Sequence, residues 1–451
     1  RTLGPVSITL LGIGAIVGTG IFVLTGVAAA TYAGPGLILS FVVAGIVSGL
    51  AAICYAEFAS TVPIAGSAYT YSYATLGELI AWIIGWDLIL EYAVGAAAVA
   101  IGWSGYLVDL LKSTFGITLP KALIASPFSG GIINLPALVI ILLITGLLIL
   151  GTSESTKVNN VIVVIKLLVI VFFLVIGFGH IQTSNWSPFL PFGAGGIFRG
   201  ASIIFFAYIG FDQISTSAEE ARNPARDLPI GIITSLLICT LLYILVTAVL
   251  TGIVSYTKLN VASPVSHALI LLGLNAAGSI ISVGAICGLT TVLIVLLFGQ
   301  SRIFFSMSRD GLLPGLFSHV HPRFRTPYLS SLLVGVVVAL VAAFTPIDVV
   351  AELTNIGTLS AFVLVSAAVL ILRRTQPDLR RGFRTPWVPV IPILSIIASF
   401  VLIVSLPGIT LIRFAVWLVI GLVIYFLYSK RKSHLQREPG EAAEIPGRDI
   451  A

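Results

Sequence analysis

Long apolar stretches alternate with short polar segments along almost the whole chain. Residues 139–150 and 161–176 are apolar at nearly every position, so neither stretch has the polar face of a soluble amphipathic helix. A bilayer core of about 30 Å is crossed by roughly 20 apolar helical residues. A membrane β-barrel would instead show segments of about 10 residues with alternating polarity. The pattern therefore predicts membrane-spanning α-helices.

The pattern predicts an all-α membrane protein with twelve transmembrane helices. Their expected limits are 4–32, 36–61, 78–112, 134–153, 157–180, 195–218, 228–254, 276–308, 328–344, 347–371, 387–406 and 409–430. The remaining residues, 431–451, are polar and contain Pro and Gly, so they have too few apolar side chains to pack. We expect a disordered tail there.

Composition agrees with this class of protein. Of 451 residues, 58% are hydrophobic and only 9% are charged, which excludes a soluble domain with an ordinary polar surface. The three cysteines lie inside apolar stretches, where they are expected to be packing residues. Zinc-ligand spacings, paired catalytic carboxylates and Ser-His-Asp arrangements are not found, and the five histidines lie in loops, at span ends or in the tail. We therefore expect neither an enzyme nor a metal site.

The formal net charge of +6 reflects topology, because the basic residues are scattered over short loops rather than gathered into a nucleic-acid-binding patch. If both termini are cytoplasmic, 18 of the 24 Lys and Arg residues lie on the cytoplasmic side. Five lie on the opposite side, namely Lys112, Lys121, Arg199, Lys258 and Arg413. This asymmetry follows the positive-inside rule for an even number of spans. We expect a multi-pass plasma-membrane protein with both termini in the cytoplasm.

The first span contains four glycines within nine residues, from Gly12 to Gly20, near the expected middle of the bilayer. Each glycine costs a helix interior about 1 kcal/mol relative to alanine. One interpretation is close helix packing through Gly14 and Gly18, which form a small-xxx-small pair. The other is an interrupted helix, whose second half begins with unpaired N–H groups that can bind a carboxylate. This segment alone leaves both open.

The sixth span has a similar feature near its midpoint, in residues 205–212, which include Gly210 and Asp212. Two interrupted spans, five apart, favour a five-plus-five inverted repeat. In such folds the broken helices present amides to substrate anions and carbonyls to cations at the bilayer midplane. An amino acid carries both charges, so the pair of interruptions predicts an amino acid transporter that works by alternating access. Asp212, directly after the second interruption, is predicted to take part in gating.

Lys166 has five apolar neighbours on each side within the fifth span. An ionisable residue at such a depth is expected to be functional. Desolvation favours loss of its proton, which would let the lysine change charge in an accessible pH range. We therefore predict that Lys166 couples transport to protons, with no other cofactor. The alternative is a lysine that snorkels, or pairs with one carboxylate, only to hold helices together.

Asp87 and Glu91 are four residues apart in the third span and so share a helix face. They are candidates for contact with the substrate side chain. For Asp87 a solvated vestibule is the favoured explanation, because Trp82 and Trp86 look like anchors at the membrane interface. For Glu91 the two explanations stay equally open.

Three motifs give the chain a family resemblance: residues 12–22 in the first span, 219–229 after the sixth and 302–314 after the eighth. Residues 383–392 add a weaker fourth. With them the chain resembles the amino acid–polyamine–organocation transporters, and among these the bacterial relatives of cationic amino acid transporters, from about residue 4 to 430. The resemblance implies a leucine-transporter-like core of ten spans in residues 1–371, with two further spans in residues 372–430.

The resemblance also implies a binding site. The substrate carboxylate would rest on the amides of Gly18, Thr19 and Gly20, with a contact from the Thr19 hydroxyl. The substrate ammonium would meet carbonyls around Ile13, Gly14, Phe206, Ala207 and Ile209. Phe206 matches the aromatic gate of the family, with Phe205 as the alternative. Lys166 matches the lysine that replaces a sodium ion between spans 1 and 8 in proton-coupled relatives. The eighth span would contribute Cys287, Thr290 and Thr291.

These implications predict a proton symporter that imports neutral or cationic L-amino acids. The apolar segment 289–297 narrows the expected side-chain pocket, so small neutral substrates stay open. An amino acid exchanger without proton coupling is the main alternative, and a channel or membrane sensor is a remote one. Expected partners are the substrate and membrane lipids, and a small accessory membrane subunit stays open.

Overall fold

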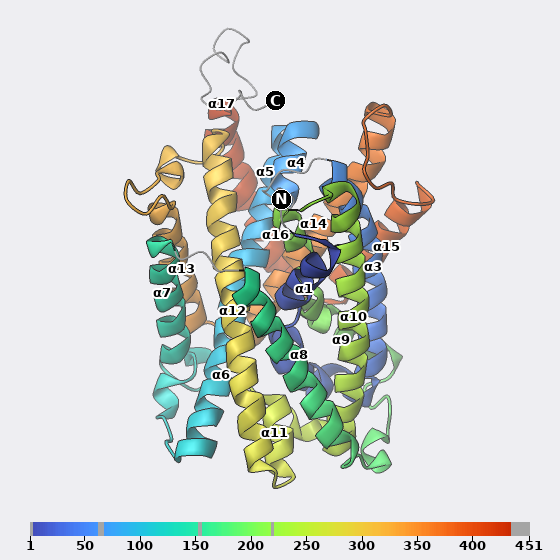
Figure 1. Ribbon diagram of the computed structural model, residues 1–451, viewed down its shortest axis with the longest axis vertical. Helices are drawn as coiled ribbons and strands as arrows, with labels where there is room; N and C mark the ends of the chain where they lie inside the picture. The colour runs from blue at the N-terminus through green and yellow to red at the C-terminus, as the bar shows by residue number, and fades with distance from the viewer. Residues whose placement is uncertain (1–2, 62–66, 152–155, 218–220, 434–451) are drawn as a thin grey trace.

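The computed structural model describes residues 3–61, 67–151, 156–217 and 221–433, and within these ranges the chain is helical, with no strand (Figure 1). Isolated backbone bridges join Leu3 to Ala221 and Ile124 to Asn134. The predicted tail lies outside the described residues, except for 431–433.

Most helices run along the long axis of the molecule (Figure 1). The long ones are α3 (Leu37–Thr61), α6 (Gly95–Phe115), α8 (Thr156–Phe178), α10 (Pro224–Ile253), α12 (Asn275–Arg309), α14 (Ile347–Thr375) and α16 (Gly408–Ile424), which continues through a π-helical turn, Tyr425–Ser429. The shorter ones are α1 (Pro5–Ile16), α2 (Thr25–Ala28), α4 (Ser67–Thr75), α5 (Glu78–Ile89), α7 (Leu135–Leu150), α9 (Ala194–Ile204), α11 (Pro264–Leu271), α13 (Tyr328–Phe344), α15 (Val390–Ser405) and α17 (Lys430–Lys432).

Eight of the described helical segments are long and apolar enough to cross a membrane, and four shorter helices, including α1 and α7, are also apolar. Each of the twelve predicted spans falls on such helices. Their outward side chains are largely apolar, for example Leu143 and Leu168, which are more than 60% exposed. A surface of this kind is stable only in contact with lipid. The protein is therefore an all-helical membrane protein, while the count of twelve crossings stays a prediction.

Two helices are interrupted within the bundle. α1 ends at Ile16, Val17 is extended, and a π-helix resumes at Gly20–Leu24. α9 ends at Ile204, a 3-10 turn follows, and the chain then passes through Ile209 and Gly210 before another 3-10 helix. Gly210 has φ +120°, which side chains rarely tolerate, and a Cβ there would lie 2.7 Å from the carbonyl oxygen of Ala15.

The two interruptions lie directly against each other. A Cβ on Gly20 would be only 2.1 Å from Cα of Ala207, so only glycine permits this approach. Around them α10 packs on α1 and α3, and α12 packs on α6 and α8. The two segments are therefore held at the centre of the bundle by helices from both halves of the chain.

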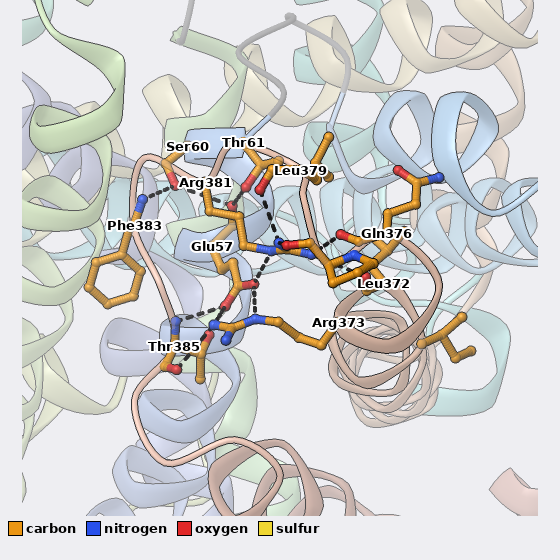
Figure 2. A network of polar contacts seen from close by, with 12 residues as sticks. Glu57, Ser60, Thr61, Leu372, Arg373, Gln376, Leu379, Arg381, Phe383 and Thr385 are labelled. Carbon is orange, nitrogen blue, oxygen red and sulfur yellow. Dashed lines mark hydrogen bonds and ion pairs between the residues drawn. The ribbon is translucent and has the colours of Figure 1, made fainter.

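A second polar cluster lies at one end of the bundle, where α3 ends (Figure 2). Glu57 accepts two hydrogen bonds of 2.8 Å from Arg373, at the end of α14. It also pairs with Arg381 at 3.0 Å and accepts a 2.7 Å bond from the backbone N–H of Thr385. This Glu57 cluster ties α3 to α14 and to the loop that leads to α15.

Candidate functional site

The interrupted helices enclose a narrow cavity. It is lined by backbone and side chains of both interruptions and by residues of the third span and α12, namely Ala15, Ile16, Gly18, Thr19, Gly20, Glu91, Phe206, Ile209, Gln213, Val292 and Leu296. Its volume is about 10 Å³, which is room for about one water molecule. The walls must therefore move apart before a molecule as large as an amino acid can enter.

The second half of the first span begins at this cavity. Thr19 is the N-cap of the π-helix Gly20–Leu24, so the amides near it belong to a helix start, where intrahelical acceptors are missing. The Thr19 side chain is 1% exposed, and its hydroxyl has no hydrogen-bond partner among the described residues. A buried hydroxyl without a partner costs free energy, which a bound polar group would recover. This end of the cavity suits a carboxylate.

Lys166 reaches the same interruption from α8. Its side chain is fully buried, and Nζ donates to the carbonyl oxygens of Gly14 at 2.7 Å and Val17 at 3.2 Å. Its alkyl chain lies against α12 at Gly288, where a Cβ would be 3.0 Å from Cε. The ammonium thus binds two carbonyls at the break, and the residues directly after it, Gly18, Thr19 and Gly20, line the cavity. A change in the charge of Lys166 would therefore alter the backbone geometry of the break.

Glu91 connects the third span to the second interruption. It lies in a π-helical turn, Leu90–Val94, and is 1% exposed. Its carboxyl group hydrogen-bonds to that of Asp212, which also accepts a 3.2 Å bond from the Tyr92 hydroxyl. Two carboxyl groups can hydrogen-bond only when one of them carries a proton. The two carboxyl groups therefore form a pair at the edge of the cavity that can share a proton, although Asp212 itself does not line the cavity.

Tyr243 of α10 is a site residue that sequence reasoning missed. Its hydroxyl lies 3.0 Å from the carbonyl oxygen of Ile16 and 2.7 Å from that of Ala207, so it bridges the two interruptions. The side chain is fully buried. The only signal in the sequence was a tyrosine within an apolar span, whose hydroxyl needs a partner when it is buried. That signal does not identify the partner.

The structure brings together only part of the predicted ammonium site. Phe206 and Ile209 line the cavity, but Ile13, Gly14 and Ala207 do not. The carbonyl of Ile13 accepts from the amide of Val17, that of Gly14 from Lys166, and that of Ala207 from Tyr243. The next two residues of the first span, Ala15 and Ile16, line the cavity instead, because α1 continues to Ile16 before it breaks.

The structure places the residues predicted for the eighth span away from this cavity. Val292 and Leu296 of α12 line the cavity, whereas Cys287 is exposed on the outside of the bundle. Cys287 precedes Leu296 by about two and a half helical turns and so lies on the opposite face. Thr290 binds Trp103, and Thr291 donates to the carbonyl of Gly288. None of the three predicted residues faces the cavity.

The solvated vestibule around Asp87 is also a wrong prediction. Asp87 is 1% exposed, and its Oδ1 has no hydrogen-bond partner among the described residues. Trp82 stacks on Trp86, and Trp86 stacks on Trp417, so both side chains pack between α5 and α16. Asp87 does not line the cavity either. Of the two carboxylates, only Glu91 does.

The fold and the site define a helical membrane protein with paired helix breaks around a central cavity, which is the architecture of a secondary transporter. The amino acid permease family profile matches residues 3–428, so the chain belongs to that family, within the amino acid–polyamine–organocation superfamily. It is a transporter and not an enzyme.

The similarity to individual relatives is extensive. The chain is 54% identical over 442 residues to the branched-chain amino acid permease BcaP of Bacillus subtilis (strain 168), covering 97% of this chain and 95% of that protein. It is 52% identical over 439 residues to the methylthioribose transporter of the same organism, with the same shares. A vacuolar cationic amino acid transporter 4 of Arabidopsis thaliana is 39% identical over 384 residues, 84% of this chain and 64% of the relative.

Proposed function

We propose that the protein imports neutral L-amino acids with apolar side chains across the plasma membrane, in symport with protons, and that both termini are cytoplasmic. Lys166 supports the coupling most directly, because its ammonium binds carbonyls of the helix break whose next residues, Gly18, Thr19 and Gly20, line the cavity. The pair of Glu91 and Asp212 supplies a second proton at the cavity edge.

The walls of the cavity support the choice of side chain. Away from the helix start, the lining consists largely of Ile16, Phe206, Ile209, Val292 and Leu296. The carboxylate in the lining, Glu91, is already engaged by Asp212 and Thr358. A cationic side chain would lose its hydration against walls that are apolar apart from Glu91, whereas an apolar side chain meets apolar walls. Similarity to a branched-chain amino acid permease agrees with this preference.

Uptake by the purified protein in lipid vesicles tests the proposal. We expect labelled leucine to accumulate in empty vesicles under an inward proton gradient. Unlabelled isoleucine and valine should compete strongly, and arginine weakly. Methylthioribose belongs in the same competition series, because a relative is named for it. Strong competition by arginine would contradict the side-chain assignment, and methylthioribose as the best competitor would contradict the amino acid assignment.

Exchange of one amino acid for another is the second candidate. The packing of Lys166 against Gly288 favours it, because a lysine that only fills space between α8 and α12 needs no change of charge. Vesicles preloaded with leucine separate the two mechanisms. A symporter accumulates substrate in empty vesicles, whereas an obligatory exchanger takes up label only into loaded ones.

A further inference from the structure

The last turn of α14 and the loop that follows it contain a dense run of basic residues. Five arginines follow one another from residue 373 to residue 384, and Asp378 is the one acidic residue among them. Two of the five, Arg373 and Arg381, are engaged by Glu57 (Figure 2). The other three are exposed and form no ion pair with any residue that the structure describes; they are Arg374, Arg380 and Arg384. The loop therefore presents an excess of positive charge.

The end of the same loop and the first residue of α15, Val390, present apolar side chains beside these charges. Trp387 is 79% exposed and Val390 is 52% exposed. They lead directly into α15, whose Leu394 and Ile397 are 46% and 55% exposed on the outside of the bundle. Tryptophan is enriched where a membrane protein passes from hydrocarbon to headgroups. We call Arg374, Arg380, Arg384, Trp387 and Val390 the 374–390 surface.

The Glu57 cluster holds this surface in shape. Arg381 donates to the carbonyl oxygens of Leu372 and Gln376, at 3.1 and 3.0 Å, as well as pairing with Glu57. The backbone amide of Phe383 donates to Ser60 at 2.9 Å. The loop is thus fixed on both α14 and α3 before any ligand arrives. A fixed arrangement lowers the entropy cost of binding.

We propose that the 374–390 surface binds the headgroups of anionic phospholipids in the leaflet at this end of the bundle. Exposed arginines match the phosphate groups in charge and geometry. Trp387 and Val390 match the boundary between headgroups and hydrocarbon. The proposal requires only that the protein lies in a membrane. It does not depend on the transported substrate or on proton coupling.

Lipid binding by the purified protein in detergent tests this assignment. The probes are phosphatidylglycerol and phosphatidylcholine, counted on the protein by native mass spectrometry. The test variant is Arg374→Gln/Arg380→Gln/Arg384→Gln. The control is Lys430→Gln/Arg431→Gln/Lys432→Gln, which removes three exposed charges from α17, at the same end of the bundle (Figure 1).

The wild-type protein should prefer phosphatidylglycerol, and the test variant should lose roughly fivefold in affinity for each arginine removed. The control variant should lose much less. An equal loss in both variants would show a general charge effect and overturn the assignment to this surface. Equal binding of the two lipids by the wild-type protein would overturn it as well.

Two further measurements guard against a folding artefact. Raising the salt concentration on the wild-type protein should weaken its preference for phosphatidylglycerol toward that of the test variant, since salt screens exposed charges. Trp387→Ala should weaken the binding of both lipids while it keeps the preference for the anionic one. A preference that resists salt, or lipid binding unaffected by Trp387→Ala, would contradict the proposed mode of contact.

Discussion

The Glu57 cluster and the central cavity are both polar regions inside an apolar bundle, but their polar groups are satisfied very differently. Glu57 meets two guanidinium groups and one backbone amide, all within 3.0 Å. Around the cavity, the hydroxyl of Thr19 and one carboxyl oxygen of Glu91 have no hydrogen-bond partner among the described residues. Gln300 of α12 is likewise fully buried, with neither end of its amide paired in the described part of the chain.

This difference indicates that the Glu57 cluster stabilises the fold, whereas the central cavity serves transport. Buried polar groups that are fully paired resist change, because breaking any one contact leaves a charge without a partner. Buried polar groups that are partly paired are costly to keep and need a reason. At the cavity, the proposed reason is that a substrate and a proton bind there and are released again. Changes at the cavity should therefore alter transport, and changes at the Glu57 cluster should alter stability.

Lys166→Ala should have the largest effect. With an inward gradient of about one pH unit, one coupled proton supplies about 1.4 kcal/mol, which is roughly tenfold accumulation. We expect the variant to lose this accumulation completely in vesicle uptake. Lys112→Ala removes an exposed lysine of α6 and should leave accumulation unchanged. Full proton-driven uptake by Lys166→Ala would refute its coupling role.

Glu91→Gln should have the next largest effect. The amide can still donate to Asp212, but it has no proton to release. We expect accumulation under a pH gradient to fall severalfold while exchange in leucine-loaded vesicles continues. Asp87→Asn is the matched control, because Asp87 is buried one turn away and does not line the cavity. Equal effects of the two substitutions would contradict a special role for the pair of Glu91 and Asp212.

Glu57→Gln should act on stability instead. It leaves Arg373 and Arg381 without their carboxylate, and breaking a buried ion pair costs about 3 kcal/mol. We expect the melting temperature in detergent to fall by several degrees, with uptake per folded molecule close to that of the wild type. Asp378→Asn, an exposed acid in the same loop, should change stability by less than about 0.5 kcal/mol. If Glu57→Gln abolished uptake without lowering the melting temperature, the Glu57 cluster would act in transport and not in stability, contrary to this prediction.

Thr19→Val should have the smallest effect on accumulation, because it acts on substrate binding alone. It keeps the volume of the side chain and all backbone amides but removes one hydroxyl. The loss of one hydrogen bond to a charged group is worth about 1.5 kcal/mol or more. We expect KM for leucine to rise about tenfold, with little change in the maximal rate. An unchanged KM would show that the hydroxyl does not contact the substrate.

Several features of the fold and of the site could be predicted from local patterns in the sequence. The apolar stretches predicted the helices, because a bilayer leaves the backbone few other solutions. Clustered glycines and a deeply buried lysine marked the region where the structure has the first interruption, the cavity and the Lys166 contacts. These features depend on residues close together in the chain. Family membership followed from motifs of the same kind.

Contacts between distant segments were decided only by the tertiary structure. Nothing in the pattern showed that Tyr243 would join the carbonyls of Ile16 and Ala207, or that Glu57 would meet Arg381. The sequence also did not identify the face of α12 that borders the cavity, since an apolar helix carries no polar stripe to fix its rotation. The sequence determined where helices form and break, because those choices are local. Packing decided which side chains meet, because that depends on how every helix turns against its neighbours.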